Sequence, residues 1–131
     1  MEETIFTKII NGDIPSYKVY EDDETFAFLD IHPAAPGHTL VVPKKQVQFA
    51  WDLDSETYQA VMKTAKQLAS HIRETLAVEY VGMKIEGVDV PHAHVHLIPF
   101  NNTDEYNNKP DMTAEPDHAR LQQMQAKISL S

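Results

Sequence analysis

Apolar side chains recur at helical spacing in three parts of the chain. Residues 55–77 carry one every three or four positions, which predicts a long amphipathic helix. Residues 5–11 show a shorter stretch of the same pattern and are followed by Gly12, a residue that favours helix termination. A further short helix is expected at about 117–129. The pattern therefore predicts two or three helices, of which only one is long.

Other segments are rich in β-branched and aromatic residues and have breakers on both sides, which is typical of strands. The polar link 22–24 favours a hairpin between the first two of them. Hairpin-linked strands combined with a few helices predict an α+β fold with a mainly antiparallel, five-stranded sheet. The five expected strands are 17–21, 25–31, 38–43, 81–86 and 92–100.

The composition favours one compact domain. The chain has 131 residues, of which 42% are hydrophobic, so residues 1–131 are expected to form a single domain with its core at about 4–100. Residues 101–131 are more polar and are interpreted as a C-terminal extension. No apolar run approaches the length of a membrane span, and the acidic N-terminus does not resemble a secretory signal, so a cytoplasmic location is expected.

The net charge and the absence of cysteine limit which partners and which kinds of site the protein can have. A formal net charge of −9 argues against a nucleic acid polymer or an anionic membrane as partner, since both are bound through Lys and Arg. A small phosphorylated ligand stays compatible, because a few local donors suffice to hold one phosphate. With no cysteine in the sequence, disulfides and thiolate metal sites are excluded.

The segment His92-Ala93-His94-Val95-His96 carries the strongest chemical signal. In a strand of period two, its three imidazoles project from one face, and the residues between them point into the core. Imidazole is a metal ligand, so a zinc site is one interpretation. The outer two rings would lie about 13 Å apart along a straight strand at ~3.3 Å per residue, which makes it hard for all three to share one ion, although two could bind one with help from elsewhere. The spacing therefore favours different roles for the three rings.

This segment and the following Leu97-Ile98 resemble the signature of the histidine triad family, in which three histidines alternate with apolar residues. The rest of the chain agrees in order over roughly residues 4–100. Residues 5–15 look like the family's opening helix and turn, and 28–31 and 36–44 look like its central blocks. The resemblance implies the family's α+β fold.

The resemblance also implies an activity and assigns roles. Family members hydrolyse or transfer nucleotidyl groups, cutting at the α-phosphorus of purine phosphoramidates or dinucleoside polyphosphates. The middle histidine, here His94, is the nucleophile that forms a nucleotidyl-histidine intermediate. His92 and His96 would donate hydrogen bonds to the phosphate or orient the ring, and His38 matches a fourth histidine beside the triad. A neutral imidazole is both a good nucleophile and a good leaving group near pH 7.

The nucleoside would be held by residues that precede the triad. Asp30 matches the acid that binds the ribose, since a carboxylate accepts hydrogen bonds from vicinal hydroxyls. Apolar positions of the opening helix and the second strand are similar to those that sandwich the base in the family. These positions are Phe6, Ile10, Phe28, Leu29 and Ile31.

The chain departs from the family pattern at two places. Many bacterial relatives hold a structural zinc with two cysteines and a histidine, but the matching positions here are Thr4, Thr7 and Gln46, so neither a metal nor another cofactor is expected. The turn 87–91 is shorter than the family's glycine-rich loop. It contains Asp89, which is expected to repel an anionic phosphate or to bind a cationic leaving group.

The resemblance implies a symmetric homodimer whose partner is a second copy, with a small purine nucleotide as substrate. Two other interpretations stay open at this point. One is a metal-binding protein or metal-dependent hydrolase that uses the same histidines. The other is a nucleotide-binding interaction protein with weak catalysis, for which the shortened loop is the argument.

Overall fold

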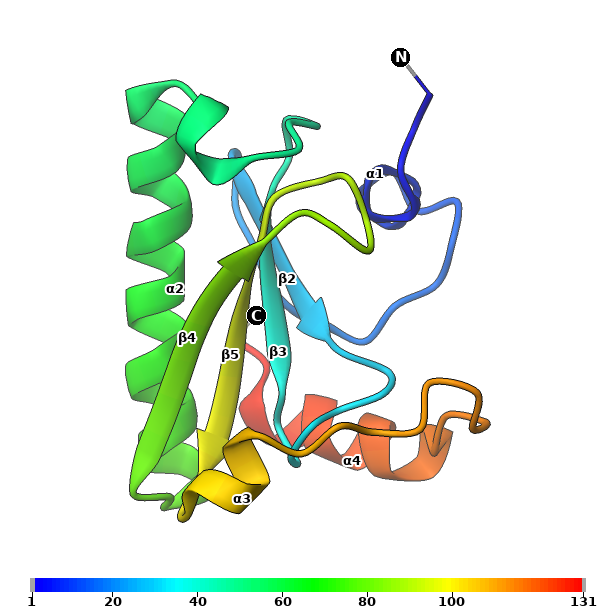
Figure 1. Cartoon of the computed structure of the whole chain (residues 1–131), viewed down its shortest axis with the longest axis vertical. Helices are drawn as coiled ribbons and strands as arrows, with labels where there is room; N and C mark the ends of the chain where they lie inside the picture. The colour runs from blue at the N-terminus through cyan, green and yellow to red at the C-terminus, as the bar shows by residue number, and fades with distance from the viewer. Residues whose placement is uncertain (1, 131) are drawn as a thin grey trace.

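The computed structural model describes residues 2–130 and contains one five-stranded antiparallel sheet (Figure 1). Along the sheet the strand order is β1-β2-β3-β5-β4. The expected α+β class and the expected number of strands are both confirmed. The elements are α1 (Ile5–Ile10), β1 (Lys18–Glu21), β2 (Thr25–Leu29), β3 (Thr39–Pro43), α2 (Ser55–Leu76), β4 (Tyr80–Glu86), β5 (His94–Phe100), α3 (Thr103–Tyr106) and α4 (His118–Ile128), with a short 3-10 helix at Ala50–Asp52.

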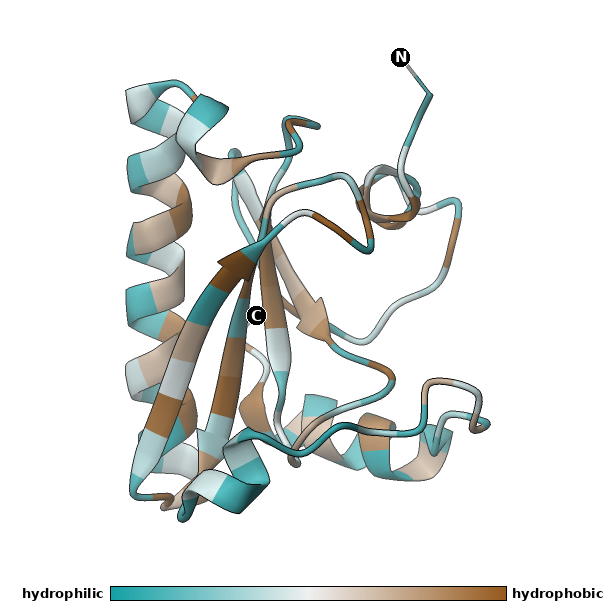
Figure 2. Cartoon of the chain, viewed as in Figure 1, coloured by the Kyte–Doolittle hydropathy of each residue, from teal (hydrophilic) through white to brown (hydrophobic). Residues whose placement is uncertain are grey.

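The long helix α2 covers one face of the sheet (Figure 1). Its apolar stripe, which includes Leu68 and Ile72, packs on the inward side chains of β2, β3 and β5, and α4 adds Leu121 and Ile128 to the same core. The side of α2 that faces away from the sheet is hydrophilic (Figure 2). Burial of these aliphatic side chains is the main source of folding free energy, at roughly 25 cal/mol per Å² of apolar surface.

The opposite face of the sheet is covered by α1 and the loops that flank it (Figure 1). A second, smaller apolar cluster forms there between α1 and the outward side chains of β2 and β3. This cluster is aromatic, with Phe6 of α1 packed edge-on against Phe28 of β2. Because β5 alternates, Val95 and Leu97 enter the α2 core while His94 and His96 face the α1 side.

Three sequence predictions about the elements are wrong. The strand expected over 92–100 begins only at His94, because Pro91 has no amide hydrogen and Ala93 donates its own to the carbonyl of Val47. The strand expected over 25–31 ends at Leu29, because the carboxylate of Asp30 accepts the His32 amide and turns the chain. A fourth helix, α3, lies in the C-terminal extension before the one helix expected there, and a capping box stabilises its N-terminus.

Within residues 2–130, no helix combines the length and the apolar content that crossing a membrane requires.

Candidate active site

A pocket of about 560 Å³ opens on the α1 face of the sheet, where the histidines gather. Its walls come from α1, from the ends of β2 and β4, from β5 and from the segment that follows α3. His94 and His96 form the floor together with His38, which precedes β3. Residues far apart in the sequence thus converge on one cavity that has room for a small ligand.

The ring of His94 is held in one tautomer by the backbone. Its Nδ1 lies 2.8 Å from the carbonyl oxygen of His92. A carbonyl can only accept a hydrogen bond, so Nδ1 carries the proton and, in the neutral ring, Nε2 keeps a free lone pair. The ring also packs edge-on against Phe6, with the centroids 5.0 Å apart, which fixes its plane. The arrangement presents one unprotonated nitrogen at the pocket.

His96 and His38 form a chain of hydrogen bonds with one direction. The amide of Ala34 donates to Nδ1 of His38 at 3.0 Å, so the proton of the neutral His38 ring lies on Nε2. That Nε2 donates to Nδ1 of His96 at 2.8 Å, and Nε2 of His96 donates to the carboxylate of Glu86 at 3.1 Å. This series of hydrogen bonds places one N–H group, that of His96 Nε2, in the pocket beside the lone pair of His94.

Burial keeps these rings neutral. Desolvation, together with the neighbouring His96, lowers the pKa of His38 to about 3. Desolvation likewise lowers the pKa of His96 and His92 below the ordinary value. Burial raises the pKa of Asp30, whose carboxylate oxygen lies 3.6 Å from Nε2 of His38. The cost of placing a charge where little water reaches explains all four directions.

His92 has a different environment from the other two histidines of the motif. Its ring is fully buried, with Nε2 at 2.8 Å from the carbonyl oxygen of Pro43 and Nδ1 at 2.9 Å from the hydroxyl of Thr4. Both ring nitrogens are therefore engaged within the protein. These contacts leave no ring nitrogen of His92 for a phosphate, whereas its backbone carbonyl holds the ring of His94.

Glu86 is a pocket residue to which the sequence analysis gave no role. It ends β4 and stands opposite His94 in the register of the two strands. Its Oε1 lies 3.1 Å from Nε2 of His96 and 3.8 Å from Nε2 of His94. The sequence signal for this contact is the short link between two expected strands, which brings the end of the first near the start of the second but does not fix the register.

The residues expected to hold a nucleoside divide into two groups. Asp30, Phe6 and Phe28 line the pocket, and Ile31 lies at its exposed rim. Leu29 reaches the pocket lining, but its side chain packs in the α2 core because it alternates with Phe28. Ile10 packs beside the aromatic cluster without lining the pocket, and Ile9 takes that place, since it lies one residue earlier on the helix.

Asp89 also lines the pocket, from the exposed turn between β4 and β5. Two lysines face the same cavity: Lys84 on β4, two residues before Glu86, and Lys109 on the segment after α3. That segment is attached to the 30–38 loop, because Asn108 donates its side-chain amide to the carbonyl of Ala34. The pocket therefore contains cations as well as carboxylates.

The family profile of the HIT domain matches residues 11–103. The chain belongs to the HIT family. A HIT-like protein of Borreliella burgdorferi is 34% identical, with 100% of this chain and 99% of that protein covered. The purine nucleoside phosphoramidase of Escherichia coli K12 is 38% identical, with 74% of this chain and 87% of that enzyme covered.

A solved HIT structure agrees with the fold over almost its whole length. The crystal structure of a HIT-like protein from Bartonella henselae superposes with a TM-score of 0.84 at 33% identity. The superposition covers 96% of this chain and 93% of that one. The agreement places this chain among HIT domains by structure as well as by sequence.

The positions that match the zinc ligands of bacterial HIT proteins do not suit a zinc ion here. The side-chain oxygen of Gln46 accepts hydrogen bonds from the Thr4 amide at 2.8 Å and from the Thr7 hydroxyl at 2.7 Å. The Thr4 hydroxyl in turn contacts His92. Hydroxyl and amide groups are poor zinc ligands, and in this HIT domain they satisfy one another. We call Thr4, Thr7, Gln46 and His92 the polar knot.

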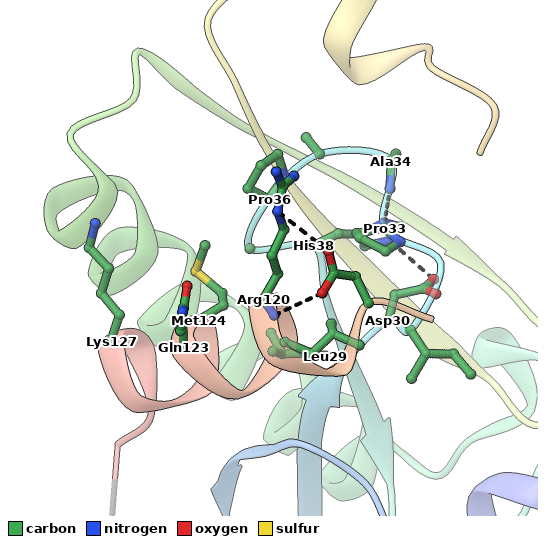
Figure 3. Close-up of a pocket in the computed structure, with 15 residues that line it drawn as sticks. Leu29, Asp30, Pro33, Ala34, Pro36, His38, Arg120, Gln123, Met124 and Lys127 are labelled. Carbon is green, nitrogen blue, oxygen red and sulfur yellow. Dashed lines mark hydrogen bonds and ion pairs between the residues drawn. The ribbon is translucent and has the colours of Figure 1, made fainter. Parts of the chain in front are cut away.

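A second pocket, of about 580 Å³, lies beyond the 30–38 loop of the HIT domain and is bounded by α4 (Figure 3). Asp30 and His38 border both pockets. From α4, Arg120, Gln123 and Lys127 project along its wall, and Arg120 pairs with Asp117 at 3.4 Å (Figure 3). The two pockets are thus separated by one loop.

Proposed function

We propose that this HIT protein is a nucleotide phosphoramidase or nucleotidyl hydrolase that acts at the α-phosphorus of a purine nucleotide conjugate. The observation that carries the proposal is the tautomer of His94, whose Nδ1 proton is held by the His92 carbonyl so that the Nε2 lone pair is free. The phosphoramidase name of the Escherichia coli relative supports the same reaction class.

The reaction proceeds in two displacements. First, the lone pair of His94 Nε2 forms a bond to the α-phosphorus, and the bond from phosphorus to the leaving group breaks. The leaving group departs with that electron pair and takes up a proton from the solvent. The nucleotidyl-imidazolium has its positive charge stabilised by the Nδ1–H bond to the His92 carbonyl. Water then attacks phosphorus, loses a proton, and the electron pair returns to Nε2.

The remaining pocket residues bind the substrate. The N–H of His96, which donates to Glu86 in the free protein, turns to a non-bridging phosphate oxygen. Asp30 accepts the ribose hydroxyls, and the base packs against the aromatic cluster that Phe6 of α1 forms with Phe28 of β2. Glu86 thus occupies the position of a phosphate oxygen until the substrate displaces it.

Replacement of the nucleophile tests the proposal. His94→Ala is expected to lower turnover of an adenosine phosphoramidate by at least about 1000-fold, because the covalent route is lost. Turnover is measured with a chelator present, and mass spectrometry of acid-quenched wild type is expected to find a nucleotidyl adduct on His94. The matched control is His118→Ala on α4, an exposed histidine outside the pocket. Unchanged turnover in His94→Ala, or tight nucleotide binding without turnover in wild type, contradicts the proposal.

A further inference from the structure

Three metal-ligand side chains meet at the proposed nucleophile. Glu86, His94 and His96 each place one ligand atom within 4.8 Å of those of the other two. The carboxylate oxygen is 3.8 Å from the His94 nitrogen and 3.1 Å from the His96 nitrogen. Tetrahedral zinc with bonds of about 2.1 Å separates its ligands by roughly 3.4 Å. Small side-chain rotations therefore bring all three atoms to bonding distance of one ion.

The backbone already supports such a site. His94 and His96 are two residues apart on β5 and face the same side, and Glu86 comes from the paired position on the neighbouring strand. The far nitrogen of His94 donates to the His92 carbonyl, which is the usual outer contact of a metal-bound histidine. The fourth position of the ion would face the open pocket.

We propose that Glu86, His94 and His96 form a binding site for a divalent transition-metal ion, best matched by Zn²⁺, and that the bound ion switches the enzyme off. Two imidazole nitrogens with one carboxylate favour zinc over Mg²⁺ or Ca²⁺, which prefer oxygen ligands. The ion takes the lone pair of His94 Nε2 that attacks phosphorus. The switching-off rests on the proposed function, whereas the binding of the ion does not.

Binding rearranges the protons of the hydrogen-bonded chain. His96 moves its proton from Nε2 to Nδ1 and donates it to His38 Nε2, and His38 carries its own proton on Nδ1. The Nδ1 proton of His38 then faces the N–H of Ala34, so Nδ1 can no longer accept the hydrogen bond from that amide. No proton leaves either ring. Because a buried hydrogen bond is given up, we expect affinity in the micromolar range, weaker than that of a structural zinc site.

A second cluster competes for the ion. Asp30, His38 and His96 also place ligand atoms within 4.8 Å of one another. There the two histidine nitrogens share one hydrogen bond, so neither has a free lone pair before an ion arrives. The Glu86 cluster is favoured because the His94 lone pair is free before the ion arrives.

Calorimetric titration with Zn²⁺ in nucleotide-free, chelator-treated buffer tests the binding. Wild type is expected to bind one ion, and Co²⁺ is expected to give the visible bands of tetrahedral coordination. Glu86→Gln is expected to weaken Zn²⁺ at least tenfold, whereas Asp89→Asn, the matched loss of a pocket carboxylate, changes the affinity less than threefold. Absent binding, equal losses in the two variants, or weakening only in Asp30→Asn each overturns the site.

Turnover of the phosphoramidate tests the consequence. Added Zn²⁺ is expected to inhibit wild type with the dissociation constant found by titration, a chelator to restore turnover, and Mg²⁺ to have no effect. Glu86→Gln is expected to require at least tenfold more Zn²⁺ for the same inhibition. Turnover that rises with Zn²⁺, or bound Zn²⁺ without inhibition, overturns the switching role. Wild type that binds Zn²⁺ but turns over no substrate contradicts the proposed function and leaves the metal site standing.

Discussion

Two backbone groups decide the protonation pattern of the whole pocket. The amide of Ala34 can only donate and the carbonyl of His92 can only accept, so each fixes the ring that it touches. With the Ala34 amide as first donor, His38 donates to His96 and His96 donates to Glu86. One free lone pair and one N–H group then stand side by side, which is the pair that nucleophilic attack on a phosphate requires.

The lowered pKa of His38 makes stability depend on pH. An unfolded histidine gains its proton near pH 6.5, whereas folded His38 stays neutral down to about 3. The unfolded state therefore binds more protons in this window, and stability falls as the pH falls from 6.5 towards 3. His38→Gln removes this dependence. Urea unfolding is expected to show that wild type loses about 2 kcal/mol more than His38→Gln between pH 7 and pH 5. Parallel curves for the two proteins would refute this.

Among the secondary-structure elements, the β4–β5 hairpin brings most of the site together. Its register places Glu86 opposite His94 and Lys84 opposite His96. The period of β5 is readable from the sequence, so the separation of histidines from core residues was predicted correctly. The register with β4 is not readable in the same way, because it depends on how the short turn folds. For that reason Glu86 was given no role.

The start of β5 shows another limit of the sequence. Alternation continues through His92, but its amide donates to the carbonyl of Val90, and the Ala93 amide donates to Val47 in the loop before α2 instead of to β4. The competing partners, Thr4 and Pro43, lie far away in the chain, so only the tertiary structure reveals that both nitrogens of His92 are taken. Helix α3 was missed for a simpler reason: four residues are too few to show a period.

Gly87 in the turn of this hairpin has no room for a side chain. A Cβ at this position would lie 1.9 Å from the backbone carbonyl oxygen of Gln48. Gly87→Ala must push the turn away from the loop before α2, so a destabilisation of at least about 1 kcal/mol is expected, with lower turnover. Denaturant unfolding measures the first effect. Val88→Ala, at the exposed neighbouring position, is the control and is expected to behave as wild type.

In the molecule as a whole, β4 is an edge strand with an apolar surface. Tyr80, Met83 and Ile85 are exposed along it, and it pairs with a strand only on its β5 side within the described residues. A long apolar edge invites pairing with another strand. We therefore propose that a second copy of the chain docks along β4, consistent with the homodimer expected from the resemblance.

A charge placed on this edge tests the dimer. Ile85→Lys is expected to shift the protein to monomers at micromolar concentration, because a lysine ammonium resists burial at the contact. Sedimentation velocity measures the mass of the particle. Met112→Lys, at an exposed apolar position that is not part of β4, is expected to leave the mass unchanged. A monomeric wild type, or an unaltered dimer in Ile85→Lys, rejects this assembly.

The polar knot at the root of α1 has a consequence for the conditions under which the protein can work. Thr4, Thr7 and Gln46 fasten the opening helix to His92 through neutral groups that contain no sulfur. In a cell under peroxide stress, a cysteine-built anchor would be oxidised and would release its ion. The anchor of this protein contains no thiol, so we expect it to hold His92 in place when zinc is scarce and oxidants are abundant.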